Sequence, residues 1–204
     1  MSSTASSANP MEPKQLHTAS PEEINKIKNI IKDLKFCMLT TQDDAGRLRS
    51  RPMGVSGELE TVADGTELTF FTYKDSHKCT EMSQHQNQVC LAFADPKNQT
   101  YVSLSGTGRV SEDRGEMERR WSPLYKAWFP DGLNTRGIAL LKVHLDAAEY
   151  WDSPSSTVAH AIAFVKSQLT GQVAKGIGQH EKVTLSDQPQ VKEGRQWMGE
   201  QSAK

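Results

Sequence analysis

The sequence predicts a mainly β fold with flanking helices, in which antiparallel strands close into a barrel or pack as a sandwich. Six short runs rich in strand-forming residues are separated by turn residues, a spacing typical of antiparallel sheets. The helical patterns interrupt these runs instead of alternating with them, which argues against a doubly wound parallel sheet. The chain has 204 residues, a length that suits one domain with a helical appendage.

Composition divides the chain into three segments. Residues 1–15 and 171–204 show no apolar period, and we interpret them as a disordered N-terminal tail and a polar C-terminal tail. Residues 16–170 carry the patterned elements and form the predicted folded domain, which ends in a helix.

The first patterned element is a helix from Pro21 to about Leu34. Ser20, Pro21 and Glu23 form a capping-box pattern, and isoleucines then recur at helical spacing. Further helices are expected at residues 76–85, 112–121 and 156–169, the last with Gly171 as its stop.

The predicted strands are residues 36–41, 47–55, 67–73, 89–94, 100–110 and 138–145. The tetrapeptide Asp95-Pro96-Lys97-Asn98 indicates a hairpin turn between the fourth and fifth strands. Gly106 and Gly108 lie within the fifth strand, where glycines mark a bulge or a bend of a barrel.

Charge and cysteine content limit the function classes. The chain has 24 Lys and Arg against 25 Asp and Glu, so no global field favours nucleic acid or an anionic membrane, and any anion site must be local. No apolar run approaches the roughly 20 residues that span a bilayer, and residues 1–15 lack the features of a signal or transit peptide. Cys37, Cys79 and Cys90 fit reduced thiols, and Cys79, His85 and Cys90 lack a fourth zinc ligand. We therefore expect a soluble cytoplasmic protein without a metal.

Three features could bind a ligand, and the first is a basic strand. Alternation places Arg47, Arg49 and Arg51 on one face, and Pro52 requires an edge or a bulge at that point. Three like charges on one face are often an ordinary solvated surface. The alternative is an anionic ligand lying across the strand.

The second feature is the start of the helix at Ser76, directly after the strand that contains Phe71 and Thr72. A helix N-terminus presents free backbone N–H groups and a partial positive charge, and Ser76, His77 and Lys78 add donors to it. This pattern indicates a phosphate cradle. The alternative is that Ser76 only caps the helix and Lys78 is solvated.

The third feature is an aromatic segment with Trp121, Tyr125, Trp128 and Phe129. The four rings show no clean helical or strand period, which indicates a packed loop. Such a loop can cover a planar ligand, form a subunit interface or simply pack in the core.

Taken together, the motifs resemble the FMN-binding split-barrel superfamily. The capped helix, R-S-R-P-M, L-T-F-F-T-x-x-x-S-x-K, V-S-L-S-G-T-G-R-V, W-F-P-D-G and E-Y-W-D occur in the family's order between about Leu16 and Leu169. The chain is most similar to the general-stress-protein branch of pyridoxamine 5'-phosphate oxidase-like proteins, which includes blue-light-inducible members. The resemblance implies a six-stranded antiparallel split β-barrel and a homodimer with FMN in two grooves at the subunit interface.

The resemblance also implies roles for individual positions. Beside the isoalloxazine it places Arg49, Ser50, Arg51, Pro52 and Met53. Phe71 and Thr72 would close the near side of the ring, while Ser76 and Lys78 would hold the phosphate. His77 stands where the oxidases often have Arg, and Trp128 would come from the second subunit with its loop.

The resemblance leaves the reaction open. The true oxidases carry a C-terminal R-x-H substrate element, whereas Arg195 is the only arginine after Trp151 here, so we do not expect oxidase activity on the vitamin. One expectation is a flavin-dependent oxidoreductase with a small-molecule electron donor or acceptor, and the other is a non-catalytic FMN-binding or flavin-sequestering stress protein. Haem or a deazaflavin in the groove is a further alternative.

Overall fold

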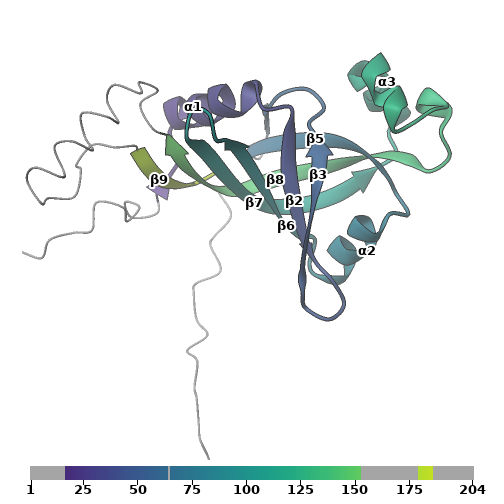
Figure 1. Cartoon of the computed structure of the whole chain (residues 1–204), viewed down its shortest axis with the longest axis horizontal. Helices are drawn as coiled ribbons and strands as arrows, with labels where there is room; N and C mark the ends of the chain where they lie inside the picture. The colour runs from purple at the N-terminus through teal and green to yellow at the C-terminus, as the bar shows by residue number, and fades with distance from the viewer. Residues whose placement is uncertain (1–16, 64, 153–178, 186–204) are drawn as a thin grey trace, which may run out of the picture.

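The computed structural model describes residues 17–63, 65–152 and 179–185 and contains the predicted barrel (Figure 1). Its six strands are β2 (Phe36–Gln42), β3 (Leu48–Gly54), β5 (Gly65–Tyr73), β6 (Gln88–Asp95), β7 (Thr100–Ser111) and β8 (Ile138–Asp152). They follow one another in the order β3-β2-β6-β7-β8-β5, and every pair is antiparallel. An isolated bridge between Val55 and Phe70 brings β5 back toward β3. The barrel is therefore split between these two strands, and the predicted mainly β split-barrel class is confirmed. The predicted strand count and purely antiparallel pairing are not exact, because the described sheet has nine strands and one parallel pair.

Three short strands were not predicted from the sequence. They are β1 (His17–Thr18), β4 (Glu60–Val62) and β9 (Gln179–Thr184). β4 pairs with β5, β9 extends the sheet beside β8, and β1 pairs with β9 in parallel. β9 lies inside the segment 171–204 that composition suggests is a polar tail, and its Val183 and the following Leu185 are buried in the core. That segment is thus more than a tail.

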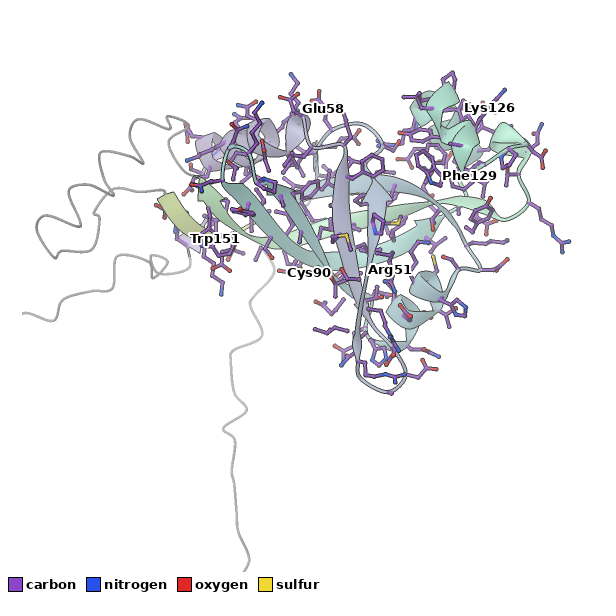
Figure 2. All side chains as sticks on the ribbon, viewed as in Figure 1. Arg51, Glu58, Cys90, Lys126, Phe129 and Trp151 are labelled. Atoms are coloured by element: carbon purple, nitrogen blue, oxygen red, sulfur yellow. The ribbon has the colours of Figure 1, made fainter. Side chains whose placement is uncertain are left out.

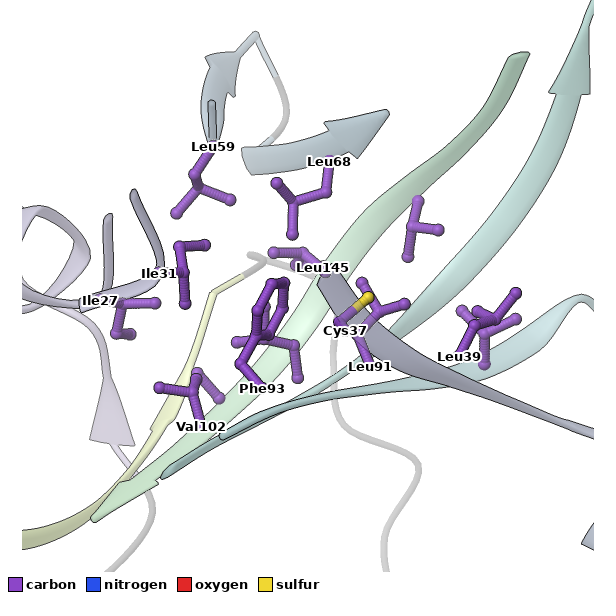
Figure 3. Close-up of a cluster of buried hydrophobic side chains, with 14 of the residues drawn as sticks. Ile27, Ile31, Cys37, Leu39, Leu59, Leu68, Leu91, Phe93, Val102 and Leu145 are labelled. Carbon is purple, nitrogen blue, oxygen red and sulfur yellow. The ribbon is translucent and has the colours of Figure 1, made fainter. Parts of the chain in front are cut away.

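The helix α1 (Pro21–Lys32) begins as its capping box predicts. The Glu23 amide donates to the Ser20 hydroxyl, and the Ser20 amide donates to the Glu23 carboxylate at 2.8 Å. Ile27 and Ile31 are buried on its inner side, where they join the barrel core. Figure 3 shows these two side chains pointing toward Phe93 and Leu145.

Two further helices flank the barrel. α2 (His77–Gln84) connects β5 to β6 and packs against β2, and its buried residues are Cys79 and Met82. α3 (Arg114–Arg120) follows β7 and is succeeded by the short 3-10 helices η1 (Pro123–Ala127) and η2 (Gly132–Asn134). Figure 1 shows α2 and α3 at separate positions around the barrel. The helix expected at residues 156–169 lies outside the described residues.

The two glycines of β7 have the role expected of a bend. The pairing of β7 with β8 changes register between Ser105 and Gly106. A Cβ atom on Gly106 would lie 2.1 Å from the carbonyl oxygen of His144, so the two backbones approach more closely there than a side chain allows. Gly108 makes room in the same way for the Met82 side chain of α2. Gly108 therefore lets the Met82 side chain of α2 pack tightly against the barrel.

Candidate functional site

The start of α2 carries neither a side-chain cap nor an acidic residue. Ser76 is the N-cap residue, but its side chain makes no capping hydrogen bond, and the first turn contains no acidic residue. The first N–H groups of a helix lack intrahelical acceptors, and the helix dipole makes this end positive. The Ser76 hydroxyl instead accepts a hydrogen bond from Lys78 Nζ at 3.1 Å and donates to Cys79 Sγ at 3.4 Å. Ser76 is thus not simply a side-chain cap.

Lys78 is a half-buried cation at this helix start. Burial is the largest cause that lowers its pKa, and the positive charge of Arg51 lowers it further. Within the described part of the chain, no carboxylate lies at ion-pair distance from its ammonium group. A partly desolvated ammonium group without a carboxylate partner gains from an anionic ligand, because the ligand replaces the lost hydration.

Arg51 lies on β3 and reaches toward α2 (Figure 2). Its Nη2 donates to Glu81 Oε2 at 2.8 Å, and its Nη1 donates to the Thr41 hydroxyl. The Thr41 hydroxyl in turn donates to Glu81. Burial alone would raise the pKa of Glu81, but these two hydrogen bonds and the Arg51 charge bring it below its usual value. The guanidinium is therefore fixed by the chain itself, close enough to Lys78 for their charges to interact.

The other two arginines of the basic strand have a local structural role. Arg47 and Arg49 both donate through Nε to Asp43 Oδ2, at 3.0 and 2.9 Å. Hydrogen bonds from the Arg47 amide, and from these side chains, lower the pKa of Asp43 to about 2. This carboxylate closes the β2–β3 turn. The three arginines are consequently not equivalent, since only Arg51 reaches α2.

The R-S-R-P-M segment presents its residues on two sides of the sheet. Arg49, Arg51 and the buried Met53 share the inner side by strand alternation, whereas Ser50 and Pro52 share the outer side. The Ser50 hydroxyl lies 3.0 Å from that of Thr40, its cross-strand neighbour.

The remaining predicted positions are dispersed. Thr72 is buried, and Phe71 packs against Trp121 and Tyr125 in a second apolar cluster beneath α3 and η1. His77 is exposed at the first position of α2. The structure thus brings Ser76, Lys78 and Arg51 together but places Phe71 in a different cluster.

The aromatic segment splits between the core and the surface. Phe129 is only 5% exposed and its ring lies near those of Tyr73 and Phe71, so this residue takes the core-packing alternative. Trp128 is 56% exposed, and its ring meets Phe36 edge to face at 6.3 Å. Tyr73 fixes this loop by donating its hydroxyl to the Trp128 carbonyl at 2.8 Å.

Trp128 stands at one end of an unusually uncharged surface, which we call the outer face. The outer face consists of Phe36, Met38, Thr40 and Gln42 of β2, Leu48, Ser50, Pro52 and Gly54 of β3, Gln88, Cys90, Ala92 and Ala94 of β6, and Tyr101, Ser103 and Ser105 of β7. None of these residues is charged. A solvated face of an antiparallel sheet normally carries charged and polar residues, so this composition is typical of an interface.

Sequence reasoning did not identify Thr41 and Glu81. Thr41 lies on β2, the strand next to the R-S-R-P-M segment, and Glu81 lies on α2 one turn after Lys78. Neither a threonine nor a glutamate indicates an anion site by itself. The helical spacing of Lys78 and Glu81, three residues apart, was the one available clue that both lie on the same side of α2. In the described ranges no group of three or more His, Cys, Asp or Glu side chains could hold a metal ion, and no helix there is long and apolar enough to span a membrane.

Comparisons with known proteins agree with this architecture. Protein bli-3 of Neurospora crassa is 27% identical over 178 residues, which are 82% of this chain and 83% of that protein. A candidate general stress protein 26 from Jannaschia sp. CCS1 superposes with a TM-score of 0.61 at 21% identity, over 81% of this chain and all of the other. The general stress FMN/FAD-binding protein of Xanthomonas citri gives a TM-score of 0.55 at 29% identity, over 67% of this chain and 93% of that chain.

The sequence profile of one family covers most of the described barrel. It is the profile described as pyridoxamine 5'-phosphate oxidase like, and it matches residues 22–175. This range contains the split barrel, α2 and the aromatic segment. The chain therefore belongs to the pyridoxamine 5'-phosphate oxidase-like family.

Proposed function

We propose that this protein binds FMN, with the terminal phosphate at the start of α2. The observation that carries the proposal is Lys78, a half-buried ammonium group that pairs with no carboxylate of the described residues, beside a helix N-terminus without a side-chain cap. Arg51 adds a second cation to the same cluster. The proposal is supported by the Xanthomonas citri relative, whose description names FMN and FAD as its ligands.

Each residue of the cluster has a distinct task in this proposal. Lys78 and Arg51 neutralise the phosphate, and the Ser76 hydroxyl donates to it together with the first amides of α2. His77 contributes its backbone amide and, when protonated, a further charge. The terminal phosphate of FMN can approach the backbone amides of α2 directly. In FAD the adenylate group is attached to this phosphate and would have to extend past the start of α2. We therefore expect FMN to bind more tightly than FAD.

We also propose that two chains form a homodimer through the outer face. Phe36, Met38 and Leu48 are 54%, 40% and 75% exposed there, in a surface that lacks any charge. A large apolar patch on the surface of a protein typically marks a site where another protein chain binds. Ser50, Pro52 and Trp128 lie on or beside this face. In a dimer, these side chains of the second copy would therefore lie at the flavin ring, while Lys78 of the first copy holds the phosphate.

The bound flavin would supply hydride or electron transfer, and we propose that the protein is an oxidoreductase that uses a small-molecule donor or acceptor. The residues of this chain then bind and orient the flavin and exclude water from one side. The positive charges at Lys78 and Arg51 anchor the ligand, and no side chain has to act as a general acid or base. A stress-related flavin-holding role without turnover is the alternative outcome of the experiment below.

The experiment is a titration of the full-length protein with FMN, FAD and riboflavin, followed by rapid-mixing reduction of the FMN complex with NADH and NADPH. We expect an absorption spectrum of bound flavin and affinities in the order FMN, FAD, riboflavin. Equal affinity for all three would contradict the phosphate site. Tight FMN binding without reduction by either nicotinamide would favour the flavin-holding role.

A further inference from the structure

Glu81 is an acidic residue in an otherwise cationic cluster. It lies on α2 one turn beyond Lys78, and its side chain is 14% exposed. Its carboxylate accepts hydrogen bonds from Arg51 and from Thr41. A carboxylate close to a phosphate site repels the ligand, so the presence of Glu81 requires a compensating benefit.

We propose that Glu81 is a positioning residue, which holds the Arg51 guanidinium beside Lys78 and thereby gives the site its preference for a flavin with a terminal phosphate. The inference rests on the function proposed above and deepens it. Glu81 itself does not contact the ligand in this account, because its carboxylate is occupied by Arg51 and Thr41.

The hydrogen bonds leave Arg51 able to bind a ligand. A guanidinium has five N–H donors, and Thr41 and Glu81 use two of them. Three donors remain for a phosphate without breaking the ion pair. An arginine side chain that is already ordered loses less conformational entropy when the ligand binds, and this gain is worth about 2- to 10-fold in affinity.

The charges in the cluster support the same conclusion. The positive charge of Arg51 lowers the pKa of Lys78, whereas the negative charge of Glu81 raises it. Glu81 therefore offsets the repulsion between the two cations before a ligand arrives. Without it, Arg51 would lose the carboxylate that the described residues pair with it, and its repulsion from Lys78 would no longer be offset.

The test measures the dissociation constants of FMN and riboflavin for the full-length wild type, Glu81→Gln, Arg51→Met and the double variant. Glutamine keeps the size of the side chain and an acceptor for Thr41 but removes the ion pair. We expect Glu81→Gln to weaken FMN binding about 3- to 10-fold and to change riboflavin binding less than about twofold. In the Arg51→Met background Glu81→Gln should cause no further loss. Glu118→Gln, which breaks an exposed ion pair with Arg114 on α3, is the matched control.

Two sets of results for Glu81→Gln overturn the inference. Tighter FMN binding by Glu81→Gln would mean that the carboxylate acts only by repulsion, and unchanged binding would mean that it does not position Arg51 for the ligand. Equal losses for FMN and riboflavin, or a loss that persists in the Arg51→Met background, would mean a general structural role. If Glu81→Gln does not fold, Thr41→Val must show the same selective loss of FMN affinity. A wild type that binds no FMN refutes the proposed function and this inference together, whereas a wild type that binds FMN leaves the variants to decide on Glu81 alone.

Discussion

Removal of the Lys78 side chain tests the anion site most directly. In Lys78→Ala the ammonium group is lost from the start of α2, where its one described hydrogen bond is to Ser76 Oγ at 3.1 Å. A charge-assisted hydrogen bond to a ligand is worth about 1–3 kcal/mol, so we expect FMN binding to weaken about 5- to 150-fold. Riboflavin, which lacks the phosphate, should bind the variant and the wild type equally.

The folded state should tolerate this change well. The pKa of Lys78 is lowered mainly by burial, which means that folding disfavours its charged form. Alanine also has a higher helix propensity than lysine. We therefore expect Lys78→Ala to be as stable as the wild type, or slightly more stable, in thermal unfolding without ligand.

Lys74→Ala is the matched control for this prediction. Lys74 lies four residues earlier and pairs with Glu112 at 2.9 Å, with both side chains well exposed. Its loss should leave FMN affinity unchanged in calorimetric titrations. If both variants bind FMN like the wild type, Lys78 is an ordinary solvated lysine. If both weaken it equally, the effect is one of net charge and the phosphate does not lie at α2.

Three further predictions concern the dimer, the bulge and the buried ion pairs. Ala92→Glu places a charge in the middle of the outer face and should give a monomer in light scattering, whereas a dimer of unchanged stability would exclude this face as the interface. Gly106→Ala forces a Cβ atom against the His144 carbonyl and should cost about 2–3 kcal/mol in urea unfolding, while Gly54→Ala, with only an ordinary contact to meet, should cost far less. Burial would raise the pKa of Glu116, but hydrogen bonds from Lys142 and Arg120 bring this pKa below 4.5. The ionised Glu116 carboxylate therefore stabilises the fold above pH 4.5, and this stabilisation is lost as the pH falls through the lowered pKa. Glu116→Gln should lose about 2 kcal/mol at pH 7 and show a flatter stability profile below pH 4.5, and parallel profiles for the two proteins would refute this assignment.

Much of the fold could be predicted because its elements have strong local patterns. The α1 capping box needs only Ser20 and Glu23, and most barrel strands carry enough β-forming residues to be recognised alone. β9 could not be recognised in the same way, because most of its residues are polar. Val183 in β9 and Leu185 directly after it were the only apolar signs of a buried side, and pairing with β8 supplies the rest of the strand's stability.

The site was harder to predict because it depends on side-chain direction. Alternation correctly put Arg49 and Arg51 on one side of β3, with Arg47 just before the strand, but it could not show that Asp43 binds Arg47 and Arg49 and that Glu81 binds Arg51. These contacts join residues that are far apart in sequence. Trp128 and Phe129 are adjacent in sequence but differ in exposure, at 56% and 5%. The tertiary fold decides which of the two rings is buried, so the sequence pattern alone could not predict it.

The parallel pairing of β1 with β9 has a consequence for how the chain is made. A ribosome releases residues 17–18 early, yet their strand partner at 183–184 emerges some 165 residues later. Until β9 is made, residues 147–152 of β8 have no strand partner on that side, so their backbone N–H and C=O groups are exposed. Exposed strand edges of this kind can pair with other chains. Synthesis must therefore pass Leu185 before the sheet is complete, and nascent chains stalled earlier should require chaperones. The same pairing brings two peptide tags fused close to His17 and Leu185 to one corner of the molecule, where an energy-transfer pair would report completion of the sheet.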